Sequence, residues 1–149
     1  MSETAQADSL AISLVSEIAT VDQLMKGRLA RALPKGMELS HFTVLDYLSR
    51  TRDERTPAQL SRTFHVTKAA MTNTLGKLER AGYVHIRPDW DDARRKYVAI
   101  SPAGERARDQ AIRAVAPVFE DIVDELGGDT IRAGLPLLRR LRVHLSDES

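Results

Sequence analysis

Apolar residues recur every three or four positions through most of this chain, and they alternate with polar residues only between residues 83 and 101. The first pattern is typical of one face of an α-helix and the second of a half-buried β-strand. The first helical stripe lies in residues 9–33, and Pro34 and Gly36 end it. We therefore expect an amphipathic helix of about 25 residues, longer than the usual globular helix, with the stripe Leu14, Ile18, Val21, Met25, Leu29 and Ala32.

Two shorter helices are predicted next. Ser40 is the expected N-cap of a helix that reaches Thr51 and turns Phe42, Leu45 and Leu48 inward. The second begins with Thr56-Pro57-Ala58-Gln59, which combines a capping threonine, a proline at the first helical position and a glutamine that closes a capping box. It should end near Phe64, with His65 and Val66 in the turn that follows.

The next helix should start at Thr67, which caps it, and stop at Gly82 in a left-handed conformation. Met71, Leu75 and Leu78 form its buried stripe, with Ala70 and Thr74 beside them. The side chains of its opposite face are small or can form hydrogen bonds, apart from basic residues at the two ends. No acidic residue occurs before Glu79. These residues are Lys68, Ala69, Thr72, Asn73, Gly76, Lys77 and Arg80. Such a face allows close approach to base edges and phosphates.

Alternation returns in residues 83–88 and 96–101, around the polar loop 89–95. Two such strands form a β-wing, which needs helices to pack on. Helix, turn, helix and wing in that order describe a winged helix-turn-helix, so the fold class is mainly α with a small β-wing.

Two further helices close the chain. Ser101 and Pro102 should open one that reaches Leu126, with a kink at Pro117. After the glycine pair 127–128, Asp129 is the expected cap of the last segment, where Pro136 predicts a bend or a later helix start. The stripes of these helices and of residues 9–33 are more than a monomer of 149 residues would cover, which favours a dimer.

Composition narrows the class of protein. The chain has 42% hydrophobic and 29% charged residues, as in soluble globular proteins, and its polar start is not a signal peptide, so we expect a cytoplasmic location. Cysteine is absent, which excludes thiol chemistry and cysteine-bound zinc. The net charge of +1 divides into +5 for residues 50–100 and −4 for the rest, which suggests that the central part faces phosphate.

The order of elements resembles the MarR family of transcriptional regulators over essentially the whole chain. The resemblance is carried by the segments Val66–Leu75, Leu78–Val84, Arg87–Asp89, Asp92–Arg95 and Val98–Ser101, in order and at family spacing. It implies a homodimer held by residues 9–33 and 102–146, with residues 38–101 as the DNA-binding domain on a pseudo-palindromic operator. It also implies a repressor that a small phenolic or anionic effector releases.

In such proteins the reader helix enters the major groove and an arginine at the wing tip probes the minor groove. That arginine is Arg94 here, with Asp92 as the carboxylate that orients it. The predicted DNA-binding residues are Thr67, Lys68, Ala69, Thr72, Asn73, Lys77, Arg87, Arg94 and Arg95.

Two positions depart from the resemblance. Many relatives carry arginine where Asn73 stands, so a guanine contact is replaced by one suited to adenine. Trp90 is unusual at a wing tip. We expect it to pack on its own hairpin in preference to stacking on DNA or an effector.

Other functions are weaker alternatives. A winged helix can serve as a protein-interaction module without DNA binding. An enzyme acting through His41 and Asp46 lacks any supporting motif. The four histidines show no metal-binding spacing, so no metal or cofactor is expected. An effector pocket is predicted where the second helix approaches the first, at Met25, Arg28, His41 and Phe42.

Overall fold

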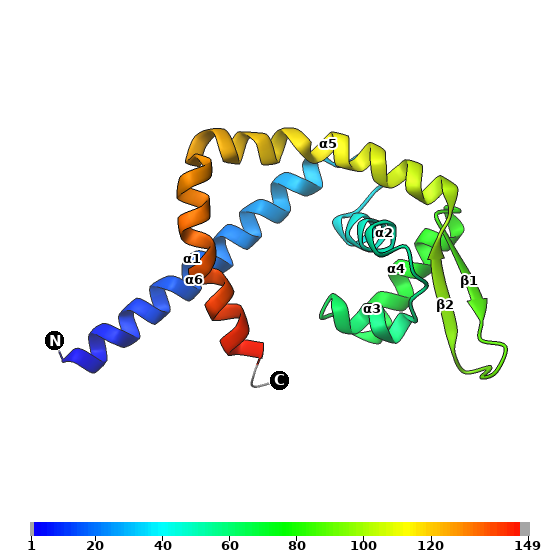
Figure 1. The fold of residues 1–149 in the computed structure, drawn as a ribbon, viewed down its shortest axis with the longest axis horizontal. Coiled ribbons are helices and arrows are strands. Elements are labelled where there is room, and N and C mark those ends of the chain that lie inside the picture. The colour runs from blue at the N-terminus through cyan, green and yellow to red at the C-terminus, as the bar shows by residue number, and fades with distance from the viewer. Residues whose placement is uncertain (1, 147–149) are drawn as a thin grey trace. The chain divides into compact units, whose positions relative to one another are not determined.

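The computed structural model describes residues 2–146, and within them the chain forms six helices and one two-stranded sheet (Figure 1). This arrangement confirms the predicted class, a mainly α protein with a small β-wing. The elements are α1 (Glu3–Ala32), α2 (Leu39–Thr51), α3 (Pro57–Thr63), α4 (Lys68–Arg80), β1 (Val84–Pro88), β2 (Lys96–Ile100), α5 (Pro102–Leu126) and α6 (Gly128–Ser146).

The chain divides into two compact units, one ending at Ala114 and the other beginning at Val115. The first holds α1 to β2 and the start of α5, and the second holds the rest of α5 and α6. α5 and α6 meet at Gly127, whose φ of 82° breaks the helix. Across the part of the chain that is described, no helix has the length and apolarity needed to span a bilayer.

The core of the first unit gathers one face from each of its short elements. The buried stripe of α4 packs in one core with residues of α2, with Leu60 of α3, and with Val84 and Val98 of the wing. These side chains confirm the predicted stripes of α2 and α4. The core residues are Val44, Leu45, Leu48, Leu60, Met71, Leu75, Leu78, Val84, Val98 and Ala107.

Both helices of the helix-turn-helix end in a left-handed residue. His65 adopts φ 53° after α3, and the Val66 amide donates to the Ser61 carbonyl at 3.0 Å. Gly82 adopts φ 80° after α4, as predicted, and the Tyr83 amide donates to the Leu78 carbonyl at 2.9 Å. These bonds satisfy carbonyls that a helix end leaves open and set a sharp exit from each helix.

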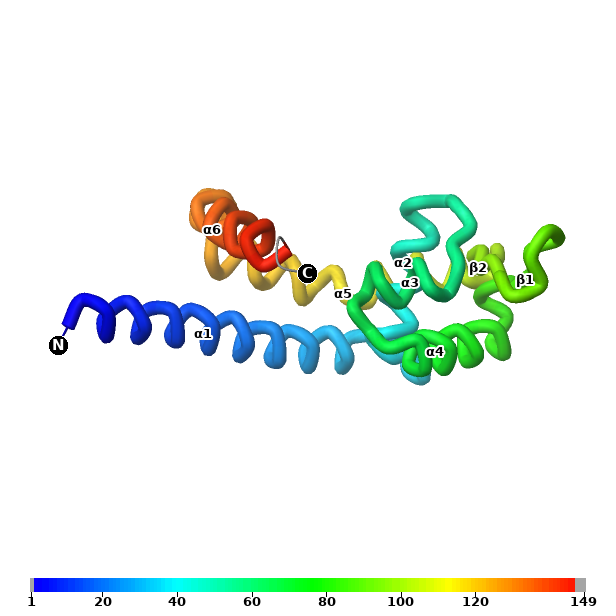
Figure 2. Tube along the Cα trace, turned by 90° about the horizontal axis from the view of Figure 1, so that it is seen from below, coloured from blue at the N-terminus to red at the C-terminus, as the bar shows by residue number. Residues whose placement is uncertain are grey.

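The wing is an antiparallel hairpin that pairs Val84 with Ile100 and Ile86 with Val98. Arg55, from the connection before α3, extends the sheet by exchanging two backbone hydrogen bonds with Val98, of 3.1 and 2.8 Å. Figure 2 shows α4 along one side of the unit with the strands beyond its C-terminal end. The wing is therefore fastened to the same connection that starts the helix-turn-helix.

Ser101 joins the wing to α5. Its hydroxyl donates to the Gly82 carbonyl at 2.6 Å and accepts from the Gly104 amide at 3.0 Å, which confirms it as the predicted cap. A Cβ on Gly104 would lie 2.1 Å from the Tyr83 carbonyl oxygen, so only glycine fits there.

Two predicted helix starts are wrong. α1 begins at Glu3, six residues before Ser9, because the Ser2 hydroxyl accepts from the Ala5 amide and caps a polar first turn. In α2 the N-cap is Glu38 and not Ser40. The Glu38 carboxylate accepts from the His41 amide, while His41 Nδ1 accepts from the Glu38 amide at 3.2 Å, which is a capping box.

The prediction that the last helix could begin only after Pro136 is also wrong. α6 begins at Gly128 and runs through Pro136, so it is not a helix that begins after the proline. Asp129 lies inside its first turn, paired with Arg132, and is not the cap. Gly127, with φ 82°, directly precedes α6, and its carbonyl accepts from the Ile131 amide at 3.2 Å.

Trp90 does not pack on its own hairpin, contrary to the prediction, since it is 85% exposed. The hairpin is held instead by its ladder and by Val84 and Val98, which are buried in the core.

Candidate nucleic-acid interface

α4 presents the predicted reader face to solvent. Thr67 caps the helix by accepting from the Ala70 amide at 3.1 Å, and Met71, Leu75 and Leu78 fix its opposite side in the core. Ala70, predicted beside the buried stripe, is exposed. The predicted DNA-binding residues of this segment that the solvent reaches are Thr67, Lys68, Ala69, Thr72, Asn73 and Lys77.

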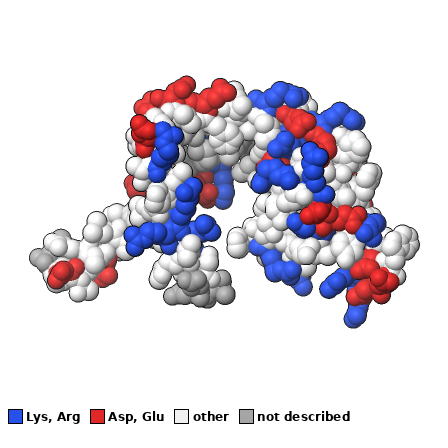
Figure 3. All heavy atoms as spheres, in the orientation of Figure 1, with Lys and Arg blue, Asp and Glu red and all other residues white. Residues whose placement is uncertain are grey.

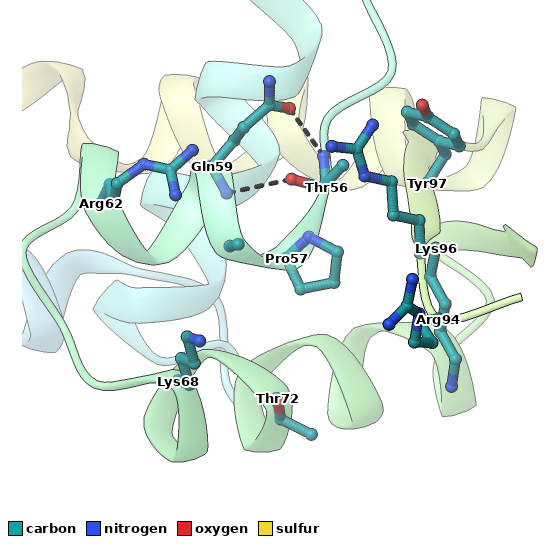
Figure 4. Close-up of a pocket in the computed structure, with 11 residues that line it drawn as sticks. Thr56, Pro57, Gln59, Arg62, Lys68, Thr72, Arg94, Lys96 and Tyr97 are labelled. Carbon is teal, nitrogen blue, oxygen red and sulfur yellow. Dashed lines mark hydrogen bonds between the residues drawn. The ribbon is translucent and has the colours of Figure 1, made fainter. Parts of the chain in front are cut away.

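A groove of about 440 Å³ lies between this helix, α3 and the wing (Figure 4). Lys68 and Thr72 line it from α4, and Arg62 lines it from α3. Among the described residues that line it, five are cations and none is an acid: Arg62, Lys68, Arg94, Arg95 and Lys96. Such a cleft concentrates positive potential and suits a phosphate chain.

The wing loop holds Arg94 as predicted. Asp92 Oδ1 accepts from the Arg94 amide at 3.0 Å and from Arg94 Nε at 3.3 Å. The Arg94 side chain is nevertheless 92% exposed. Its guanidinium is therefore aimed by a carboxylate while it stays available to a ligand.

Arg87, also predicted to contact DNA, has an intramolecular role. Its Nε donates to Glu54 Oε1 at 2.9 Å, a second bond joins its Nη2 to Glu54 Oε2, and its guanidinium lies 4.8 Å from the centre of the Tyr97 ring. Through these hydrogen bonds the guanidinium lowers the pKa of the Glu54 carboxyl. Arg87 thus ties β1 to the connection before α3.

Charged side chains of both signs meet around the wing. Figure 3 shows blue Lys and Arg atoms along the lower edge of the winged unit, next to the red carboxylates of the wing. Asp89 and Asp92 accept hydrogen bonds from loop amides, and Asp89 accepts another from the Tyr97 hydroxyl of β2, so the carboxylates help to shape the loop.

A second cavity, of about 630 Å³, lies beside His41. Of the predicted effector residues His41 lines it, whereas Met25, Arg28 and Phe42 are not among its lining residues. Its walls are polar and apolar in about equal parts, and Glu38, His41 and Lys77 are among the polar residues. The lining is Pro34, Lys35, Gly36, Met37, Glu38, His41, Lys77, Leu78, Ala81, Tyr83, Ala107 and Gln110.

His41 Nε2 is buried and finds no hydrogen-bond partner among the described residues. Because Nδ1 accepts from the Glu38 amide, the neutral ring carries its proton on Nε2. Burial lowers the pKa of His41, and Glu38 opposes this effect only in part, with its Oε2 3.9 Å from Nε2. The imidazole is therefore an unused donor at neutral pH.

Comparison with known proteins shows which solved structures and which family model this chain resembles. A mutant of MarR from E. coli in complex with operator DNA aligns with a TM-score of 0.78 and 25% identity, over 88% of this chain and 94% of its own. A family model described as the MarR family matches residues 35–95, from before α2 into the wing loop. Residues 35–95 therefore match the MarR family, and the chain has the fold of MarR.

Two further solved structures, of lower sequence identity, share the fold. BldR, a transcriptional regulator of Sulfolobus solfataricus, aligns over 99% of both chains with a TM-score of 0.72 and 21% identity. BpsR of Bordetella bronchiseptica, whose DNA binding is regulated by 6-hydroxynicotinic acid, aligns over 87% of this chain and 98% of its own, with a TM-score of 0.78 and 15% identity. No curated protein matches the chain.

Two cations of the groove, Arg62 and Lys96, are not among the DNA-binding residues predicted from the sequence. Arg62 closes α3 and Lys96 opens β2, so each faces the cleft only once the wing has folded against α3. The one signal in the sequence was the basic excess of residues 50–100.

Proposed function

We propose that this protein is a dimeric, sequence-specific DNA-binding transcriptional regulator. The observation that carries the proposal is the groove without acids that runs from Lys68 and Thr72 on α4 to Arg94 on the wing. Phosphates bind in this groove, Thr72 and Asn73 read base edges in the major groove, and Arg94 enters the minor groove. Residues 38–101 are the DNA-binding domain.

Arg87 has no direct part in this proposal, because Glu54 and Tyr97 already occupy its guanidinium. The remaining predicted residues contact the DNA backbone and position the protein on it. They are Thr67, Lys68, Ala69 and Lys77 at α4 and Arg95 in the wing loop. The alternative, a protein-interaction module, does not require five cations in one cleft.

We propose dimerisation through residues 9–33 and 102–146. Of the described residues, none of α1 or α6 is buried, and both helices expose large apolar side chains. They include Leu10, Val21 and Leu24 on α1 and Leu137, Leu138, Val143 and Leu145 on α6. Exposed apolar area of this extent favours association, and a two-fold dimer would read a pseudo-palindromic operator.

The steep salt dependence of DNA binding tests the proposal. The logarithm of the association constant for a duplex containing the chain's own upstream sequence should fall against the logarithm of salt, with a slope of roughly −0.9 per phosphate neutralised. Arg62→Ala should make the slope shallower by about one per protomer, because each groove then neutralises one phosphate fewer. Fluorescence anisotropy at several salt concentrations measures both effects. A protein that binds no duplex at low salt would contradict the proposal.

We further propose that the regulator is a repressor released by a small anionic molecule bound beside His41. An apolar ring would pack on Met37, Leu78 and Ala107, while a carboxylate would accept from His41 Nε2 and pair with Lys77. Lys77 lies on the reader helix and now faces Glu38 at 3.5 Å. An anion that competes for Lys77 would therefore alter the reader helix where it binds DNA.

Benzoate is a suitable probe for this cavity. It should bind the wild-type protein and weaken its hold on DNA, and His41→Gln should reduce benzoate affinity about tenfold, because a hydrogen bond to a charged group contributes roughly 1.5–3 kcal/mol. Glutamine can still accept from the Glu38 amide, so α2 stays capped. Titration calorimetry and anisotropy measure the two effects. Equal benzoate binding by both proteins would place the ligand elsewhere.

A further inference from the structure

The wing loop is an ordered scaffold. The Asp89 amide donates to the Arg95 carbonyl at 3.0 Å, and the Arg95 amide donates to the Asp92 carbonyl at 2.9 Å. Asp89 also accepts from the Asp91 amide at 2.9 Å and from the Tyr97 hydroxyl at 3.3 Å. With its backbone fixed at these points, the loop presents its outward side chains in set directions.

Trp90 is a large apolar side chain that this loop exposes to solvent. It is 85% exposed and is the chain's one tryptophan. An indole can bury roughly 150–250 Å² against a partner and can donate through its Nε1–H. The core and the strand ladder hold the hairpin without it, so its position is not explained by the fold of the wing.

The residues that lie in the same loop as Trp90 indicate which kind of partner its side chain contacts. Arg94, four residues from Trp90, has a 92% exposed side chain, and Arg94, Arg95 and Lys96 continue into the cationic groove. A surface of this kind suits a phosphate backbone, and proteins that bind the minor groove combine arginines with apolar side chains that contact the bases. Resting on the proposed function, we propose that Trp90 is a DNA contact that packs on the deoxyribose wall of the minor groove entered by Arg94.

The acids of the loop are compatible with this contact. Asp89 is engaged by the Asp91 amide and the Tyr97 hydroxyl, and Asp92 by Arg94. Asp91 is exposed beside Trp90 and opposes the phosphates, so Asp91→Asn should tighten DNA binding about two- to threefold.

The tryptophan reports on its own environment. In the 149-residue protein, acrylamide quenching of Trp90 fluorescence should fall several-fold when the upstream duplex is added. Trp90→Ala should weaken duplex binding about tenfold and Trp90→Phe by less, because the phenyl ring retains part of the contact. Both variants should keep the wild-type melting temperature, since the side chain is exposed in the free protein.

The outcomes separate this inference from the proposed function. If the wild-type protein binds DNA while Trp90 stays equally quenchable and Trp90→Ala binds as tightly, the Trp90 contact is overturned and the regulator stands. If Trp90 is already protected without DNA, in a manner that depends on protein concentration, the side chain meets another protein and the inference fails. If the wild-type protein binds no duplex at low salt, both fail.

Discussion

Replacing Arg94 with alanine should weaken operator binding about 1,000-fold. A side chain that reads a groove contributes about 2 kcal/mol, a dimer carries two copies, and each 1.4 kcal/mol is a factor of ten. The effect should be this large because Asp92 already orients the guanidinium, so little conformational freedom is lost on binding. Anisotropy titrations at one fixed salt concentration measure it.

Matched variants show whether charge or position is responsible. Arg106→Ala on α5 removes the same charge from an exposed site outside the groove and should change affinity less than twofold. Asp92→Ala keeps the arginine but frees it, and should produce a smaller loss than Arg94→Ala. Wild-type affinity in Arg94→Ala would remove the wing from the interface.

The double substitution Val21→Glu and Leu24→Glu should convert the dimer into monomers and abolish operator binding at nanomolar concentrations. The two side chains are 56% and 65% exposed, and helical geometry of about 100° per residue places both on the face of Leu10. Burial of a leucine or valine contributes about 1.5–3 kcal/mol, and four carboxylates would enter the interface. The dissociation constant of the dimer should rise at least about 1,000-fold.

The control adds the same charges to another face of α1. Ser16 and Gln23 are exposed polar residues that lie about 140° and 160° around the helix from Val21. Ser16→Glu with Gln23→Glu should therefore leave the dimer intact. Sedimentation velocity at micromolar protein gives the assembly state of each variant. A double Val21→Glu, Leu24→Glu protein that remains dimeric would place the interface elsewhere.

The sequence was sufficient where structure is local. The capping box of Thr56 and Gln59, the helix stop at Gly82 and the hydrogen bonds between Asp92 and Arg94 each join residues within five positions. The start of α1 was missed because its first turns carry almost no apolar residues to mark a period, although Ser2 caps them. A single capping residue is a weaker sequence signal for a helix than a periodic run of apolar residues.

Contacts between distant residues could not be predicted. Glu54 and Arg87 are 33 positions apart, and nothing in either neighbourhood indicates that they pair. The unpartnered Nε2 of His41 likewise depends on α2, α4 and α5 closing around it. The exposure of Trp90 shows that an aromatic residue in a hairpin loop need not pack on the hairpin.

The fastening of the wing has a consequence for the DNA itself. Arg55 pairs with Val98 and Glu54 with Arg87, so the wing is tied to the connection that precedes the helix-turn-helix. In the proposed binding mode, α4 in the major groove and Arg94 in the minor groove of one half-site would keep a constant helical phase. One inserted base pair between them would shift one segment by about 3.4 Å and rotate it by about 35°. The gap inside each half-site should tolerate no variation, whatever bases fill it.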